Sequence, residues 1–398
     1  MTAVARSRIG ALSGSRIREI ANAAMGRDDV LPFWFGESDQ PTPEFIRQAG
    51  ADALLAGRTF YTQSYGIPPL RQALSDYLTR LHGRPVSPSR VTVTSAGISA
   101  LMIAMQSILD PGDRVVAVTP VWPNLCEIPR ILNAEVEEVA LTPRDGRWSL
   151  DLDRLIEALK PGVRLLLINS PGNPTGWMLD EASRDVILDH CRRLGIWIIG
   201  DDVYERLPLE GDSIAAPTFA RIATDDDRVI SVNSFSKAWR MTGWRLGWLV
   251  LPEPLAADLG KLMEFNTPCA PDFVQAGAIV ALEQGDPETE AQLAELRANR
   301  DLLCGALSGL PGVECVTPDG GMYVFFRMNG SQDSMEFCRR LIDEAGLGLA
   351  PGAAFGTGGE GWLRWCFASR PSTIEKGIGR LEAWIARHQT PLARSARA

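Results

Sequence analysis

The chain has 398 residues, of which 45% are hydrophobic and 22% are charged. These fractions are ordinary for a folded globular protein, which excludes global disorder, and the length exceeds what one hydrophobic core supports, which predicts two domains. Asp and Glu number 49 against 40 Lys and Arg, so the formal net charge is −9. An acidic chain is a poor general binder of nucleic acid or of an anionic membrane surface, and neither partner is expected.

Membrane, secreted and metal-binding classes are also disfavoured. The longest apolar runs, such as 165–168 and 196–199, have the length of a core strand rather than of a membrane span. The first residues are basic but lack the apolar region of a secretory signal, although a transit peptide could begin in this way. The seven cysteines contain no CxxC pair and the three histidines are scattered, so we expect no disulfide framework, no metal site and a cytoplasmic protein.

Strands and helices alternate through the middle of the chain. We expect strands at residues 91–97, 113–120, 164–171, 196–204, 228–236 and 244–252, with helices at 98–110 and 181–195. Continuous apolar strands separated by helices favour a mostly parallel sheet that is covered on both faces. In such sheets ligands bind at the carboxyl ends of the strands, so the polar residues that follow these strands are the candidates for chemistry.

The last part of the chain changes character. A long helix is expected at 288–309, followed by a strand, turn and strand at 312–328, a helix at 334–346, a strand at 362–368 and a closing helix at 373–388. Antiparallel strands with flanking helices predict a smaller α+β domain. We therefore divide the chain into an N-terminal arm with part of the small domain (1–45), a large domain (46–287) and a small C-terminal domain (288–398).

The strongest local signal is the segment SFSKAWRMTGWRLGW, in which Lys237 follows a predicted strand. Ser234, Ser236 and Arg245 lie nearby. A lysine among hydroxyls and an arginine suits a cofactor with an aldehyde and a phosphate, because the lysine forms a Schiff base while the other groups bind phosphate oxygens. Arg245 would also lower the pKa of Lys237. For this lysine alone, a surface residue beside helix-capping serines is the simpler interpretation.

The same stretch resembles the lysine segment of the class I/II (fold-type I) pyridoxal-phosphate-dependent aminotransferases, which include aspartate aminotransferase. Further matches follow in the family's order from Phe35 to Arg364. The resemblance implies an α/β fold with a large domain, built on a mostly parallel seven-stranded sheet covered by helices, and a smaller α+β domain formed from both termini. It also implies that pyridoxal 5′-phosphate is bound to Lys237.

The resemblance implies the contacts of the cofactor ring. In the loop NSPGNPTG, Asn173 corresponds to the residue that hydrogen-bonds the ring oxygen; in DDVYE, Asp201 corresponds to the acid that pairs with the pyridine nitrogen and Tyr204 to a phenol that bonds the ring oxygen. Asp202 and Glu205 are interpreted as solvated or supporting residues. The alternatives are a turn residue for Asn173 and a helix N-cap for Asp201.

Other matched segments imply the phosphate and stacking contacts. In SAGISAL, the backbone N–H groups of Gly97 and Ile98 would face the phosphate at a helix start, although similar turns occur without a ligand. Trp122, after a strand, corresponds to the aromatic residue that stacks on the ring; core packing is its alternative. Tyr61 would reach the phosphate of a partner subunit's cofactor, which implies a homodimer; its alternative is a core tyrosine.

Two further matches concern the substrate. Arg364, in WLRWCFA, corresponds to the arginine that holds the substrate α-carboxylate through two hydrogen bonds. Gly36, in FGESDQPTP, lies where the family's N-terminal segment closes over the substrate. The substrates implied are an amino acid and a 2-oxo acid, which react in two half-reactions in which Lys237 transfers the α-proton.

Other reactions on the same scaffold remain alternatives. These are elimination at Cβ or Cγ (including C–S cleavage), amino-acid oxidation and cyclisation, since the same core residues serve all of them. Release of pyruvate and ammonia without an amino acceptor would favour a lyase. A non-catalytic sensor of the cofactor is disfavoured, because the matched region leaves no room for a DNA-binding module and the net charge has the wrong sign.

The amino donor is predicted to be neutral or aromatic. Relatives that use aspartate hold its distal carboxylate with a cation, but Ile98 occupies one of the two family positions for that cation, and the segment 266–275 offers none at the other. The aromatic run at 33–35 would make the pocket more apolar. The cations that could substitute, and that the sequence does not place, are Arg16, Arg18 and Arg58.

Overall fold

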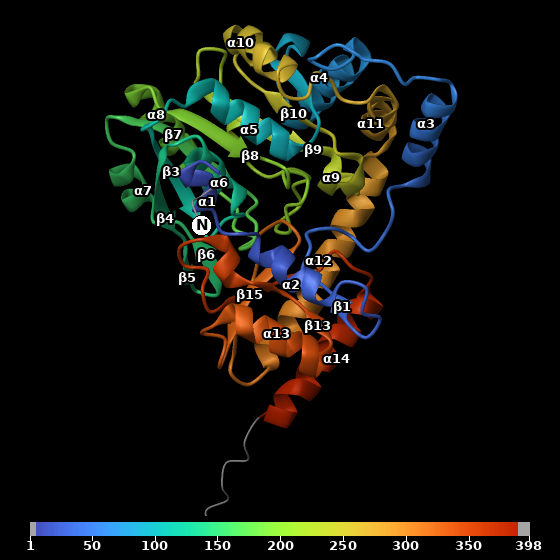
Figure 1. Cartoon of the computed structure of the whole chain (residues 1–398), viewed down its shortest axis with the longest axis vertical. Helices are drawn as coiled ribbons and strands as arrows, with labels where there is room; N and C mark the ends of the chain where they lie inside the picture. The colour runs from blue at the N-terminus through green and yellow to red at the C-terminus, as the bar shows by residue number, and fades with distance from the viewer. Residues whose placement is uncertain (1–4, 389–398) are drawn as a thin grey trace, which may run out of the picture.

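A computed structural model describes residues 5–388 and contains two packed parts that share one long helix, α12 (Asp286–Gly309) (Figure 1). The upper part holds a seven-stranded sheet between helices, and the lower part holds a four-stranded antiparallel sheet with its own helices. This is the predicted fold class. Among the residues described, no helix is both long and apolar enough to cross a membrane.

The large sheet is parallel except at one strand. Its order is β2 (Val91–Thr94), β10 (Gly247–Val250), β9 (Val229–Ser234), β8 (Trp197–Asp201), β7 (Val163–Asn169), β3 (Arg114–Thr119) and β4 (Glu135–Ala140). Strand β10 runs antiparallel to both of its neighbours, while β9, β8, β7, β3 and β4 are mutually parallel. The sequence does not predict β4 as a strand, because this edge strand is rich in glutamate and lacks an apolar run.

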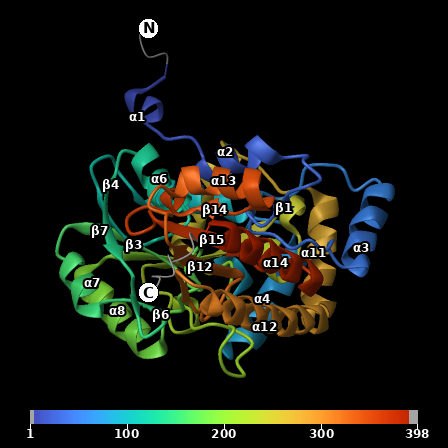
Figure 2. The ribbon, with the colours of Figure 1, turned by 90° about the horizontal axis from the view of Figure 1, so that it is seen from below.

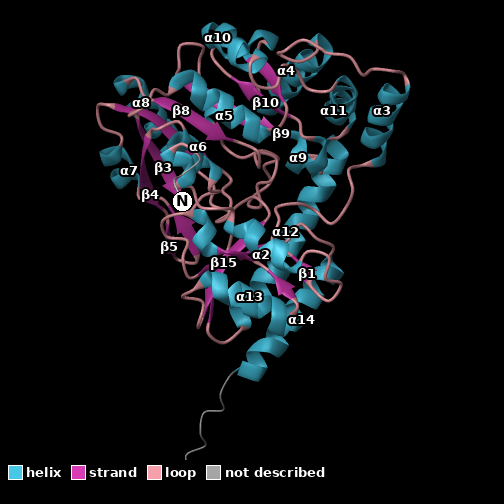
Figure 3. Cartoon of the chain, viewed as in Figure 1, coloured by secondary structure: helices cyan, strands magenta, loops and turns pink. Residues whose placement is uncertain are grey.

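Helices cover both faces of this sheet, as Figure 3 shows. One face carries α5 (Gly97–Ile108), α6 (Asn124–Ile131) and α10 (Glu253–Glu264), and the other carries α7 (Leu152–Ala158) and α8 (Glu181–Leu194). Successive side chains of a strand point to opposite faces. In β3, Val115 and Ala117 therefore join the first core, while Val116 and Val118 join the second.

The lower part is built from both ends of the chain. Its sheet has the order β11 (Val313–Val316), β12 (Tyr323–Met328), β15 (Trp362–Cys366) and β14 (Ala350–Pro351), with helices α2 (Arg16–Ala24), α13 (Ser334–Ala345) and α14 (Pro371–His388). A short parallel pair, β1 (Leu31–Pro32) with β13 (Leu347–Gly348), attaches the N-terminal segment. The predicted domain limits at residues 45 and 287 are not tested by these contacts and stay a prediction.

The remaining elements are short or lie at the side of the molecule. Figure 2 shows α1 projecting near α6, where the Arg6 guanidinium donates to the Ile131 carbonyl (3.2 Å). The remaining elements, short or peripheral, are α1 (Ser7–Gly10), the hairpin of β5 (Thr142–Arg144) and β6 (Arg147–Ser149), α3 (Glu44–Leu55), α4 (Pro68–His82), α9 (Phe235–Ala238) and α11 (Asp272–Gln284). Helices α4, α9 and α11 pack with β2 and β10 in a third core.

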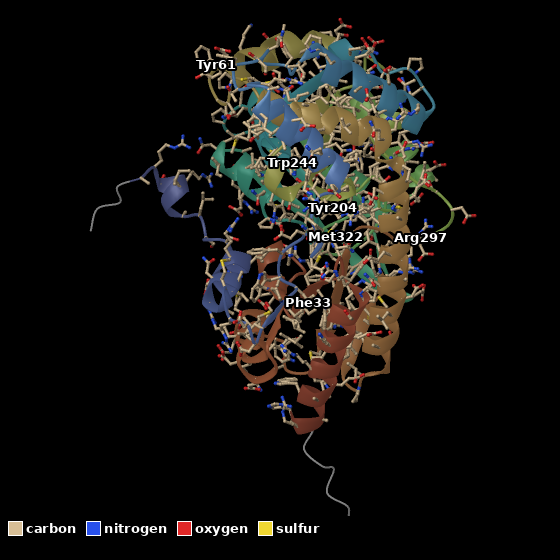
Figure 4. The ribbon with its side chains drawn as sticks, turned by 90° about the vertical axis from the view of Figure 1, so that its right-hand side faces the viewer. Phe33, Tyr61, Tyr204, Trp244, Arg297 and Met322 are labelled. Carbon is tan, nitrogen blue, oxygen red and sulfur yellow. The ribbon has the colours of Figure 1, made fainter. Side chains whose placement is uncertain are left out.

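Trp244 fills the junction between α3 and α11 (Figure 4). A Cβ added to Gly50 of α3 would lie 2.7 Å from the Trp244 ring, and a Cβ added to Gly277 of α11 would lie 2.6 Å from it. The indole N–H donates to the hydroxyl of Thr42 (3.0 Å), which holds the ring in place. Glycine is therefore required at both helix positions for lack of space.

We expect Gly277→Ala to lower the free energy of unfolding by about 1–3 kcal/mol, because the added methyl group overpacks this junction. The matched control is Gly305→Ala in α12, where nothing lies within 4 Å of the added Cβ. That control should gain roughly 0.5–1 kcal/mol, since alanine loses less backbone entropy in a helix. Chemical unfolding at one protein concentration measures both, and equal gains for the two variants would contradict the packing argument.

Candidate active site

The predicted site residues gather where three parallel strands end. Asp201 closes β8, Asn173 lies in the loop after β7, and Lys237 follows β9. The register places Asn169 of β7 opposite Asp201, and Asp201 opposite Val232 of β9, so the three ends share one edge of the sheet. Figure 4 places Tyr204, three residues after Asp201, at the junction with the lower part.

Lys237 lies partly buried on the short helix α9, with its amine directed at the N-terminal segment. The Nζ atom donates a hydrogen bond to the carbonyl of Gly36 and lies 5.8 Å from the centroid of the Tyr204 ring. Burial lowers the pKa of Lys237 to about 8, and the positive charges of Arg364 and Arg245 act in the same direction. A pKa of about 8 leaves roughly a tenth of this amine unprotonated at pH 7, a far larger share than in an ordinary lysine, as a nucleophile or base requires.

Asp201 is 3% exposed, and its Oδ1 atom has no hydrogen-bond partner among the described residues. Burial raises the pKa of this carboxyl to about 7, against the opposing effects of a backbone hydrogen bond at Val203 and of the Lys237 charge. It ends a strand and caps no helix, so the N-cap alternative is wrong. A buried carboxylate oxygen without a partner suits a ligand that brings a hydrogen-bond donor.

Arg364 reaches this edge from β15 of the lower sheet, with 2% of its surface exposed. Its Nη1 donates to Oδ1 of Asn173 (2.8 Å), Nη2 donates to the Trp34 carbonyl, and Nε has no partner among the described residues. The guanidinium lies 4.5 Å from the centroid of the Tyr323 ring and 5.0 Å from that of Phe355. These two rings hold a planar cation at the site, where it can receive a carboxylate.

Two tyrosine hydroxyls meet beside these groups. The hydroxyl of Tyr204 is 2.7 Å from that of Tyr323, a residue of β12, and both side chains are buried. Burial raises the pKa of both phenols, so both keep their protons at neutral pH. Tyr323 is absent from the sequence-based set, and its partner lies 119 residues away in the chain. The one available signal was that a buried Tyr204 hydroxyl needs a hydrogen-bond partner, which the sequence does not identify.

The predicted phosphate turn is tightly packed. Gly97 begins α5 beside Ile98, and a Cβ on Gly97 would lie 3.4 Å from that of Ser234. A Cβ on Gly247 would lie only 2.7 Å from the Gly97 nitrogen, so β10 lies directly against this helix start. The positive end of a helix with free N–H groups suits an anion. Arg245, exposed in the single chain, lines a cavity of about 850 Å³ together with Ser95.

The two serines beside Lys237 bond to each other. The Ser234 side chain caps α9 by accepting from the N–H of Ser236 (3.1 Å), and the two hydroxyls are 2.9 Å apart. The capping alternative is therefore correct for Ser234. Both serines are buried near the turn that begins at Gly97, so capping and phosphate binding are compatible roles.

The aromatic residues that the sequence placed at the site differ in their burial and in their distance from it. Trp122 is only partly buried, and the N–H of the preceding Val121 donates to the carbonyl of Phe355 (3.0 Å), so this segment approaches the Arg364 pocket. Phe33 and Trp34 are buried in the core of the lower part, so most of the aromatic run at 33–35 does not line a pocket. Tyr61 is 92% exposed, which rules out a core role, and Figure 4 shows it far from Tyr204 in this chain.

A polar network lies next to Asp201. Asp202 and Glu205 are buried, which agrees with their interpretation as supporting residues and contradicts the solvated alternative. Glu205 pairs with His82 at the end of α4 (2.7 Å), and Asp202 accepts from the hydroxyl of Ser231 on β9. Among residues 5–388, no three His, Cys, Asp or Glu side chains are grouped so that they could hold a metal ion.

Comparisons with known proteins extend over nearly the whole chain. The family model for aminotransferase class I and II matches residues 28–381. The aspartate aminotransferase of Pyrococcus horikoshii is 31% identical over 94% of this chain and 95% of its own. An arginine–pyruvate transaminase of Pseudomonas aeruginosa is 33% identical over 87% of both chains.

A solved structure agrees with these matches. A single mutant of Thermus thermophilus aspartate aminotransferase superposes with a TM-score of 0.88 and 29% identity, over 96% of this chain and 100% of its own. The family model, the relatives and the fold thus agree with one another. The chain belongs to the class I and II aminotransferases and is a pyridoxal-phosphate-dependent transaminase that exchanges an amino group between an amino acid and a 2-oxo acid.

Proposed function

We propose that this transaminase takes a neutral or aromatic L-amino acid as its donor, and that Lys237, Asp201 and Arg364 carry the reaction. The observation that supports this assignment is the convergence of a lysine of lowered pKa, a buried carboxylate with an unpartnered oxygen and a buried arginine at one sheet edge. Within the described part of the chain, the other three lysines, Lys160, Lys261 and Lys376, are exposed, and Lys261 is paired with Asp258.

The residues present fit pyridoxal phosphate. The unpartnered Oδ1 of Asp201 would receive the ring N–H, and Asn173 and Tyr204 would contact the ring oxygen, with Trp122 against the ring face. The phosphate would lie at the start of α5, bound by Gly97, Ile98, Ser234, Ser236 and Arg245. When bound, the cofactor supplies an aldehyde that links to an amine and a ring that withdraws electrons.

Each protein group then has a distinct task. Lys237 Nζ would hold the cofactor through its aldehyde and, as a free amine, would take the proton from the substrate Cα. Asp201, kept from water, stabilises positive charge on the ring nitrogen. Arg364 exchanges the Trp34 carbonyl for the substrate α-carboxylate, which fixes the direction of the Cα–H bond, and Gly36 on the overlying segment excludes water.

We expect Lys237→Ala to lower transamination by about 10³-fold or more, because the amine acts both as the attachment point and as the base. The matched control Lys261→Ala should match the wild type. Absorbance spectra of the purified proteins with added pyridoxal phosphate and a panel of amino acids provide the measurement. A Lys237→Ala protein that keeps both the lysine-linked cofactor band and turnover would refute the assignment.

The contacts around the three candidate cations support a neutral or aromatic donor. Arg58 is paired with Asp272 through two hydrogen bonds (2.5 and 3.0 Å), and Arg16 donates to the Ala353 carbonyl (2.9 Å). Arg18 lies on the surface, 5.7 Å from the centroid of the Phe35 ring. Ile98 is apolar and supplies no cation. Among the described residues, Arg18 is the one of these three arginines whose guanidinium has no hydrogen-bond partner, and it lies near the segment that covers Lys237.

The donor preference follows from these contacts. We expect kcat/KM for aspartate to be at least about tenfold below the best of alanine, leucine and phenylalanine, since a distal carboxylate lacks a dedicated partner. Steady-state assays with one fixed 2-oxo acid give the ratio. A preference for aspartate that disappears selectively in Arg18→Ala would reverse the assignment and identify Arg18 as the distal contact.

A homodimer is part of the same proposal. Four large apolar side chains are strongly exposed: Leu55 (84%), Phe60 (83%), Tyr61 (92%) and Phe265 (91%). Exposed aromatic groups of this kind favour contact with another protein surface, and the cavity lined by Arg245 also borders Leu54 and Thr267. A second copy would cover these residues and bring Tyr61 to its partner's phosphate. The seven free cysteines are consistent with the cytoplasmic location we propose.

Hybrid dimers test whether Tyr61 acts across the interface. Tyr61→Ala and Lys237→Ala should each be strongly impaired alone. After co-refolding of a one-to-one mixture, about a quarter of the wild-type sites should work, because half of the dimers are mixed and each holds one intact site. Assays at limiting pyridoxal phosphate measure the recovery. If activity does not rise above the mean of the two variants, Tyr61 serves its own chain or no site.

A further inference from the structure

The contact between Tyr204 and Tyr323 joins the two parts of the molecule at the site. Tyr204 follows β8 of the large sheet, whereas Tyr323 begins β12 of the small one. Their hydroxyls are 2.7 Å apart and their rings meet edge to face, with centroids separated by 5.7 Å. Each hydroxyl has the other as its only hydrogen-bond partner among residues 5–388. One of the two protons is therefore left without an acceptor from the described chain.

Packing fixes where the Tyr323 hydroxyl lies. A Cβ added to Gly36 would be 1.9 Å from this oxygen, so the phenol occupies the space that any other residue at position 36 would need. The Arg364 guanidinium covers one face of the ring, and the register sets Tyr323 opposite Cys366, two residues beyond Arg364 on β15. Because the ring is held on these sides, its oxygen stays within hydrogen-bonding reach of Tyr204.

We propose that Tyr323 is a positioning residue that donates its hydroxyl proton to the Tyr204 oxygen and so directs the Tyr204 proton toward the cofactor ring oxygen. This inference rests on the proposed contact between Tyr204 and that ring oxygen. If Tyr204 instead donated its proton to the Tyr323 oxygen, only lone pairs of Tyr204 would face the ring oxygen, and the two oxygens would repel each other. Hydrogen bonds in such a chain polarise one another, so a donor behind Tyr204 makes Tyr204 a stronger donor.

The consequence is a defined shift in the acid–base behaviour of the bound cofactor. Negative charge on the ring oxygen stabilises a proton on the nitrogen that links the cofactor to Lys237. A donor to that oxygen disperses the charge and thereby lowers the pKa of the linking nitrogen. Loss of the Tyr323 hydroxyl should therefore raise this pKa, in the same direction as loss of the Tyr204 hydroxyl but by less.

The test compares Tyr323→Phe, Tyr204→Phe and the double variant, each loaded with pyridoxal phosphate, by following the absorbance of the bound cofactor from pH 5 to 10. Tyr323→Phe should raise the spectroscopic midpoint by about half a pH unit, and Tyr204→Phe should raise it further. In the Tyr204→Phe background, the second substitution should have no additional effect. KM for the amino donor should stay within about twofold, since the ring that covers Arg364 is kept.

The matched control is Tyr77→Phe, which removes another buried hydroxyl, one that accepts a hydrogen bond from Arg206 (3.1 Å) and, among the described residues, is bonded to neither Tyr204 nor Tyr323. It should leave the midpoint unchanged. An unchanged midpoint in Tyr323→Phe, or equal shifts with and without the Tyr204 hydroxyl, would overturn the inference. These results are distinct from failure of the proposed function, in which the wild-type protein itself would show no lysine-linked band.

Discussion

The parallel register of β7, β8 and β9 is the constraint on which the site depends. Because these strands run in one direction, their carboxyl ends meet at one edge of the sheet. The loop with Asn173, the end residue Asp201 and the helix with Lys237 therefore lie together there, although they are far apart in the sequence. The antiparallel strand β10 then sets Gly247 against the start of α5. The large sheet supplies one wall of the site, and the lower sheet supplies the other through Arg364 and Tyr323.

Desolvation explains the chemistry of the assembled site. Burial lowers the pKa of the Lys237 amine to about 8 and raises the pKa of the Asp201 carboxyl to about 7. Both groups therefore titrate near neutral pH, where small changes in their surroundings alter their charge. Two aromatic rings flank the buried Arg364 guanidinium, and its Nη atoms donate to the Asn173 side chain and to the Trp34 carbonyl, which a substrate carboxylate would replace.

Sequence reasoning identified the features that are local. Apolar runs located the buried strands, and the polar residues predicted to follow three of them do lie together at one edge of the sheet. No strand was predicted at β4, because its glutamates break the apolar pattern, and the choice between a solvated and a supporting role for Asp202 and Glu205 stayed open, because their partners come from other elements. The Glu205 and Tyr204 contacts span 123 and 119 residues, so neither follows from spacing. Two residues of the 33–35 run do not line the pocket as predicted, because the side chains of Phe33 and Trp34 pack in the lower core.

The long helix α12 has a mechanical consequence. Its first residue, Asp286, is bonded to Arg206 of the upper part (3.0 Å), Gln292 donates to the backbone carbonyl of Lys237 (3.0 Å), and its later leucines are buried in the lower core. A helix of 24 residues is a stiff rod of roughly 36 Å, so each degree of tilt moves its far end by about 0.6 Å. A tilt of α12 would therefore shift the lower part, whose sheet carries Arg364, and would also strain the hydrogen bond from Gln292 to the Lys237 backbone.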